Sequence, residues 1–149
     1  MIKKIAGASA LLMLLSVPAQ AANFMDAAWA TQACAAWNAD STLTSGLMDT
    51  DGYSWAKNDG GRGYKLVQMY RTQCGDATKI QLNIVVKDGK ASCAYGGAPD
   101  GKAMDYGVDY LMHANDADWA CMGKGEFGCG AMGAMMSGKL NFKGPKVRL

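Results

Sequence analysis

The residues best suited to chemistry in this sequence are five cysteines: Cys34, Cys74, Cys93, Cys121 and Cys129. Thiols form disulfides, ligate soft metals or act as nucleophiles. No Cys-x-x-Cys pair occurs, which argues against a thioredoxin-like redox site. Because the number is odd, two disulfides would leave one thiol free or bonded to another chain. The sequence leaves the pairing open, and we favour Cys121 with Cys129 because both flank the same glycine-rich turn.

Methionines gather around the last two cysteines. Met122, Met132, Met135 and Met136 all lie between positions 122 and 136. Thioethers and thiols suit Cu(I), so a copper-binding protein is one hypothesis. However, Met132 and Met136 are one helical turn apart, and no histidine accompanies them. Methionine clusters more often fill irregular cores or line adaptable apolar surfaces, and we prefer that interpretation.

Patterns of catalytic residues are weak throughout the sequence. His113 is the only histidine and Glu126 the only glutamate, which excludes a His-rich zinc site and a pair of catalytic glutamates. A Ser–His–Asp triad lacks its G-x-S-x-G motif. Segment 49–52 is a fragment of a calcium loop without the remaining ligands, and the G-x-G-x-x-G of 128–133 lacks the preceding strand of a dinucleotide site. We therefore expect neither an enzyme nor a bound cofactor.

The N-terminus has the three regions of an export signal. Two lysines precede an uncharged apolar stretch over 5–17, and Ala19-Gln20-Ala21 supplies the small-x-small pattern that a signal peptidase cleaves. The apolar stretch is too short to span a bilayer core of about 30 Å. We predict a signal peptide over 1–21, cleaved between Ala21 and Ala22. The remaining 22–149 would be one mature domain, periplasmic or secreted.

Export would change the net charge of the protein and the expected redox state of its cysteines. Cleavage removes Lys3 and Lys4 and leaves 13 basic against 13 acidic side chains. A domain with no net charge and with scattered charged residues lacks the basic surface that binds nucleic acid or an anionic membrane. An oxidising compartment makes disulfides the expected state of the cysteines.

The elements that must position these residues follow from hydrophobic periodicity. We expect helices over 24–43, 116–122 and 131–137, and strands over 64–74, 79–87, 90–95, 106–113 and 139–143. Asp26 and either Asn115 or Asp116 are candidate helix caps, and Gly123 is expected to end its helix. The pattern indicates an α+β domain with helices packed on one side of antiparallel strands.

The clearest strand covers 79–87. Its apolar residues Ile80, Leu82, Ile84 and Val86 alternate with polar ones, which is typical of a strand with one buried side. Asp88-Gly89 then predicts a hairpin turn.

Two segments of the C-terminal half form recognisable motifs. Residues 108–119 pass from a predicted strand into a capped helix, and residues 136–140 read M-S-G-K-L, followed by F-K-G at 142–144. Both segments resemble the sterol carrier protein-2 (SCP2) lipid-transfer domain: M-S-G-K-L is identical to part of that family's signature, and 142–144 fits it conservatively. The resemblance covers roughly residues 79–145.

This resemblance implies a five-stranded, largely antiparallel sheet and an apolar tunnel between sheet and helices. Such a tunnel holds a sterol, a fatty acyl chain or another lipid, and needs no catalytic group. The residues expected to line it are apolar or sulfur-containing: Ile80, Leu82, Ile84, Val86, Trp119, Met122, Phe127, Met132, Met135 and Met136.

Members of that family continue past the last strand into a helix that helps to close the tunnel, whereas five residues follow Gly144 here. We expect an open pocket, or one shared with a periplasmic partner protein or a second copy. Three hypotheses follow: an exported lipid carrier, a structural or interaction subunit of the same fold without a cavity, and a Met/Cys-based Cu(I)-binding protein.

Overall fold

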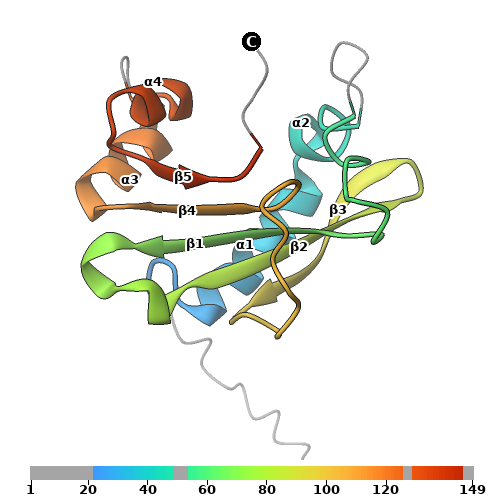
Figure 1. The fold of residues 1–149 in the computed structure, drawn as a ribbon, viewed down its shortest axis with the longest axis horizontal. Coiled ribbons are helices and arrows are strands. Elements are labelled where there is room, and N and C mark those ends of the chain that lie inside the picture. The colour runs from blue at the N-terminus through green and yellow to red at the C-terminus, as the bar shows by residue number, and fades with distance from the viewer. Residues whose placement is uncertain (1–21, 49–53, 126–128, 146–149) are drawn as a thin grey trace, which may run out of the picture.

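The computed structural model describes residues 22–48, 54–125 and 129–145, which form a five-stranded sheet with helices on one face (Figure 1). In chain order the helices and strands are α1 (Ala27–Ala39), α2 (Ser41–Thr44), β1 (Lys65–Arg71), β2 (Ile80–Lys87), β3 (Lys90–Gly97), β4 (Tyr110–Ala114), α3 (Asp116–Lys124), α4 (Ala131–Met136) and β5 (Asn141–Lys143). Two short 3₁₀ turns, η1 (Thr72–Cys74) and η2 (Asp76–Thr78), connect β1 to β2. The predicted α+β class is confirmed.

The strands lie in the order β3-β2-β1-β4-β5, and all neighbours are antiparallel except β1 and β4. The sheet is therefore mixed and largely antiparallel, as expected, with β1 and β4 as its parallel pair. The reason is the connection after β3. Residues 98–109, which we call the strap, cross in front of β2 and β1 and bring the chain back to the starting end of β1 (Figure 1). A parallel neighbour requires such a crossover.

Several element boundaries differ from those expected. The helix predicted over 24–43 is divided at Asp40, whose carboxylate accepts the N–H of Thr42 at 2.7 Å and so starts α2. Strand β4 starts later than predicted because Asp109 N–H donates to the Asp105 carbonyl in a turn. Helix α3 continues through Gly123 and ends at Gly125, whose φ of 63° is the left-handed conformation that glycine adopts without strain.

Both predicted cap sites are occupied as expected. The Asp26 carboxylate accepts the Trp29 N–H at 2.7 Å at the start of α1. Of the two candidates for α3, Asn115 is the cap, and its side chain accepts the Asp118 N–H at 2.9 Å.

The sheet is buried on both faces over its central strands. On the helix side, Ile80, Leu82 and Ile84 are buried beneath α1, as the alternation predicts. Val86 departs from the pattern and is 41% exposed, because it lies where the hairpin runs past the helix. On the other side, Gln81 and Asn83 are buried, so the expectation of a solvated polar face was wrong there.

The strap covers these amides and satisfies their hydrogen bonds. The Asp100 carboxylate accepts from the Gln81 and Asn83 side chains at 2.8 and 2.9 Å, and Lys102 donates to it at 2.5 Å. Gln68 of β1 donates to Gln81 at 2.8 Å and extends the network. Buried amides are tolerated because every member has a partner.

The far end of the strap is fastened by a buried carboxylate, that of Asp109. The Arg62 guanidinium donates two hydrogen bonds to it, at 2.7 and 3.0 Å, and the backbone N–H groups of Leu66 and Asp105 donate two more at 2.8 Å. Burial acts to raise the pKa of Asp109, but these donors outweigh it and hold the pKa below its ordinary value. Asp109 thus joins the strap to the start of β1.

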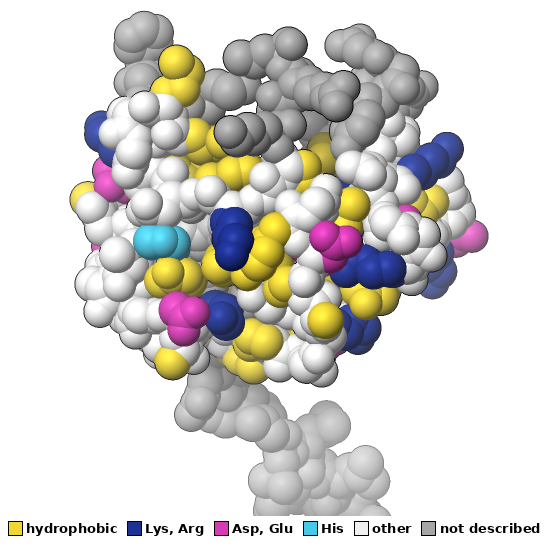
Figure 2. Space-filling model, in the orientation of Figure 1, with side chains coloured by type: hydrophobic (Ala, Val, Ile, Leu, Met, Phe, Trp, Pro, Cys, Tyr) yellow, Lys and Arg dark blue, Asp and Glu magenta, His cyan; other side chains and the backbone are white. Residues whose placement is uncertain are grey.

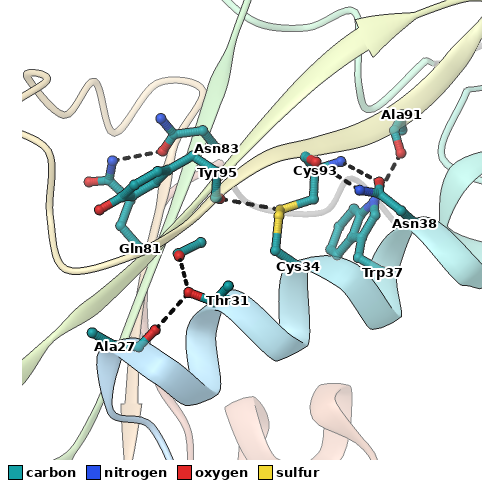
Figure 3. Close-up of a disulfide and its surroundings, with 11 residues drawn as sticks. Ala27, Thr31, Cys34, Trp37, Asn38, Gln81, Asn83, Ala91, Cys93 and Tyr95 are labelled. Atoms are coloured by element: carbon teal, nitrogen blue, oxygen red, sulfur yellow. Dashed lines mark hydrogen bonds between the residues drawn. A yellow bond between two sulfur atoms is a disulfide. The ribbon is translucent and has the colours of Figure 1, made fainter. Parts of the chain in front are cut away.

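Helix α1 is fastened along the outer edge of β3 (Figure 3). Cys34 and Cys93 form a disulfide, and the Asn38 side chain exchanges two hydrogen bonds of 2.8 Å with the Cys93 backbone. Trp37 donates to the Ala91 carbonyl at 2.9 Å. Gly96 allows this close approach, because a Cβ there would lie 2.2 Å from the Ala30 carbonyl oxygen.

The second disulfide joins Cys121 to Cys129, as favoured from the sequence, and Cys74 is the remaining thiol, exposed on η1. Two disulfides are compatible with an oxidising compartment outside the cytoplasm.

We expect the Cys34–Cys93 disulfide to stabilise the fold strongly, because it closes a loop of 59 residues. Replacing both cysteines by alanine should lower the free energy of unfolding by about 2–5 kcal/mol in urea titrations. Cys74→Ser, at an exposed free thiol, is the matched control and should leave this energy unchanged. Equal stability of the double variant and the control would show that the hydrogen bonds alone hold α1 on β3.

Candidate ligand-binding groove

An open groove lies where the start of α1 meets the ends of three strands. It has a volume of about 420 Å³. Its walls come from segment 23–27 at the start of α1, from the β1–β2 connection with the first residue of β2, and from Ala98 and Pro99 after β3. Volumes of about 300–1,000 Å³ are typical of small-molecule sites. We name this feature the α1 groove.

The lining of the α1 groove is largely apolar. Met25 is buried, and Phe24 is partly exposed with its ring edge-to-face against Trp29 at a centroid distance of 5.3 Å. Ile80 and Ala77 lie on the β1–β2 side and Pro99 on the strap side. An apolar chain is the chemical group that this lining suits best, since it offers dispersion contacts and loses no hydrogen bond to water.

The backbone at the groove is strained at one residue. Met25 has a φ of 59°, in the left-handed region that a long side chain rarely adopts. The turn is held by its neighbours: Asp26 N–H donates to the Asn23 carbonyl at 3.0 Å, and Asn23 N–H donates to the Asp26 carboxylate at 2.9 Å. Strain of this kind often concentrates at binding sites.

Among the residues that the structure describes, three charged ones line the groove: Arg71, Lys79 and Asp26. Arg71 forms a two-pronged ion pair with Asp116, which raises the pKa of Arg71 and lowers that of Asp116. The backbone N–H groups of Trp29 and Asn23 hold the pKa of Asp26 below its ordinary value. Lys79 is paired with Asp76 at 3.1 Å.

The structure distributes the residues expected to line a lipid tunnel over several places. Ile80 lies in the α1 groove. Leu82 and Ile84 are packed in the core beneath α1, and Val86 is exposed at the other end of β2. The apolar side of the strand thus contributes one residue to the groove.

The residues expected from the C-terminal half form a separate cluster. Trp119, Met122 and Met135 are partly buried against Ala114, Ala134 and Leu140, between β4 and the helices α3 and α4. Met136 is 84% exposed and points away from this cluster. Phe127 and the side chain of Met132 lie outside the described residues.

Sequence reasoning missed Phe24, Met25 and Pro99 as groove residues. The sequence after the predicted cleavage site predicts the start of a helix, which places the cap Asp26 correctly but gives no reason to expect Phe24 and Met25 in a groove. No spacing relates positions 24–25 to position 99, because a fold-specific contact brings them together. A left-handed methionine leaves no signal in the sequence.

Residues outside the groove that could do chemistry form no metal site in the described part of the chain, and His113 is packed against its neighbours. Among residues 22–48, 54–125 and 129–145, no group of three or more His, Cys, Asp or Glu side chains is arranged to hold a metal ion. The His113 ring stacks on Tyr70 at 4.5 Å and shares a hydrogen bond of 2.8 Å with the Thr72 hydroxyl. On the strap side of the sheet, Figure 2 shows cationic, anionic and hydrophobic side chains interleaved, with no broad region of one sign.

Lys65 is a buried lysine that the alternation of β1 does not predict. Its ammonium group donates to the Asn58 carbonyl at 2.6 Å and lies over the rings of Trp55 and Tyr110, 4.7 and 5.4 Å from their centroids. Burial lowers its pKa from 10.5 to about 8, against the attraction of Asp109 and Asp59. The side chain is inaccessible to a substrate, so its role is in packing and in the pH dependence of stability.

We expect alkaline pH to stabilise the protein through Lys65. Between about pH 8 and 10.5 the unfolded chain holds a proton that the folded protein has lost, so the free energy of unfolding rises with pH, in total by about 3 kcal/mol. Urea titrations of Lys65→Met and of the parent at several pH values, both carrying Cys74→Ser, would measure this contribution of Lys65 to the free energy of unfolding. A parent-minus-variant difference that stays constant above pH 8 would contradict it.

No helix in the described part of the chain is long and apolar enough to cross a membrane. No protein-family model and no curated protein matches the chain. A solution structure from Thermus thermophilus, of a conserved hypothetical protein described as a possible sterol carrier protein, is similar at a TM-score of 0.45 and 16% identity over 84% of this chain and 76% of that one. A likeness at this distance assigns neither a family nor a ligand.

Proposed function

We propose that this protein is an exported lipid-binding protein that holds the apolar part of its ligand in the α1 groove. The observation that carries the proposal is the groove itself, which has a volume of about 420 Å³ and whose lining includes Met25, Ala77 and Ile80. Binding of this kind needs no catalytic group, because each buried CH₂ contributes about 0.8 kcal/mol.

Two features of the sequence support the proposal. The predicted signal peptide would place the protein in the periplasm or outside the cell, where a lipid crosses an aqueous space only with a carrier. The signature over residues 136–140 resembles that of the SCP2 lipid-transfer domain. The α1 groove lies at the start of α1, whereas the resemblance predicts a tunnel between the sheet and the helices.

The copper hypothesis is weakened by the disulfide between Cys121 and Cys129. Neither sulfur is then a thiolate, which is the ligand that Cu(I) would require from these residues. The remaining hypothesis, a structural or interaction subunit without a cavity, differs from the proposal in one respect: such a protein does not bind lipid at all.

We expect Ala77→Trp to block the groove, because this exposed alanine lines it and a large ring would occupy the space. Losing contact with about three methylenes should weaken dodecan-1-ol binding about fiftyfold by isothermal titration calorimetry. Ala35→Trp, on the exposed side of α1 and outside the groove, is the matched control and should bind as the parent does. Thermal unfolding of each variant would show that the fold is retained.

Two results would count against the proposal. A parent protein that takes up no dodecan-1-ol, and that carries no lipid in native mass spectrometry after gentle purification, would favour the interaction subunit. If Met135→Lys abolishes binding and Ala77→Trp does not, the ligand lies between β4 and α4, as the sequence predicted, and the α1 groove is not the site.

A further inference from the structure

The α1 groove has an unbalanced set of charges. Of the charged residues that line it, Arg71 and Lys79 are cationic and Asp26 is anionic, while the carboxylates that pair with the two cations, Asp116 and Asp76, lie outside the lining. Among the described residues, the lining thus holds two cations and one anion, and the carboxylates paired with the cations are not part of it.

Asp26 does not cancel this excess. One of its oxygens accepts the Trp29 N–H at 2.7 Å and the other accepts the Asn23 N–H at 2.9 Å. These bonds direct its charge toward the start of α1, where the helix presents unpaired N–H groups and a partial positive charge. The carboxylate and the helix end offset each other, and the two cations remain.

Lys79 is the cation that is free to change partner. Arg71 is held by two hydrogen bonds to Asp116. Lys79 has a single bond to Asp76, three residues earlier, and the two side chains are 28% and 66% exposed. Exposed ion pairs of this type are weak and screened by water. An anion that entered the groove could therefore take the place of Asp76 at little cost.

Lys79, Ile80 and Met25 all line the groove. A ligand with its chain on Ile80 and Met25 would have the Lys79 side chain in the same groove as a partner for its polar end. Resting on the proposed function, we infer that the groove selects a single-chain amphiphile with an anionic headgroup, and that Lys79 is the specificity-determining residue. The ammonium would donate a charge-assisted hydrogen bond to a carboxylate or phosphate oxygen.

The test compares ligands that share one chain and differ in headgroup: dodecanoate and dodecyl phosphate, each below its micellar concentration, and dodecan-1-ol, below its solubility limit. Calorimetry on the full mature protein should give about tenfold tighter binding of dodecanoate than of dodecan-1-ol. Lys79→Gln should remove this preference and leave the affinity for dodecan-1-ol within about twofold. The dodecyl phosphate arm distinguishes a carboxylate headgroup from a phosphate one, according to which anion binds more tightly.

Two further variants sharpen the result. Asp76→Asn removes the counterion that competes for Lys79 and should tighten dodecanoate binding about two- to fivefold. Lys90→Gln makes the same charge change at an exposed lysine at the opposite end of the β2–β3 hairpin, and should leave the preference intact.

Equal binding of dodecanoate and dodecan-1-ol by the parent protein would overturn the inference while the proposed function stands, since the alcohol alone reports on the apolar groove. A preference for dodecanoate that persists in Lys79→Gln would likewise remove Lys79 as its cause. If neither ligand binds, the proposed function fails and this inference fails with it.

Discussion

The attachment of α1 to β3 is the constraint on which the rest of the structure depends. An edge strand presents unpaired backbone groups, and here side chains of the helix satisfy them: Asn38 pairs with both backbone groups of Cys93, Trp37 donates to Ala91, and Thr31 donates to Gly96. The disulfide to Cys34 makes the attachment covalent. With α1 held in this place, its apolar residues cover β2, and its first turn comes to lie at one end of the sheet, where the α1 groove is.

The opposite face of the sheet is organised by two carboxylates rather than by apolar packing. Asp109 is buried among donors from Arg62 and from two backbone N–H groups, and Asp100 gathers the amides of β2 with Lys102. Each holds one end of the strap. Because Ala98 and Pro99 precede Asp100 directly and form a wall of the groove, the same network that buries the polar face also sets the position of that wall. The groove therefore depends on both faces of the sheet.

Much of the fold could be predicted from the sequence, and the errors have physical causes. The helix caps at Asp26 and Asn115 and the apolar side of β2 were predicted because each depends on residues close together in the chain. The parallel pairing of β1 with β4 depends on where the strap runs. The burial of Gln81 depends on Asp100, which is distant in sequence. The alternation of β2 therefore predicts one buried face, although the structure covers both faces of this strand. The candidate site was predicted least well. Ile80 was expected to line a lipid tunnel and does line the groove, whereas Leu82, Ile84 and Val86 lie elsewhere.

By itself, the sequence determined the local elements, the α+β class, the preference for pairing Cys121 with Cys129, and the expectation of export with a neutral mature surface. These follow from periodicity, caps, spacing and charge, which act over short distances or on the whole composition. Only the tertiary structure decided that Cys34 pairs with Cys93, that Lys65 is buried against aromatic rings, and that segment 23–27 meets Pro99 around a groove. Each of those contacts joins residues whose approach is set by packing across the sheet.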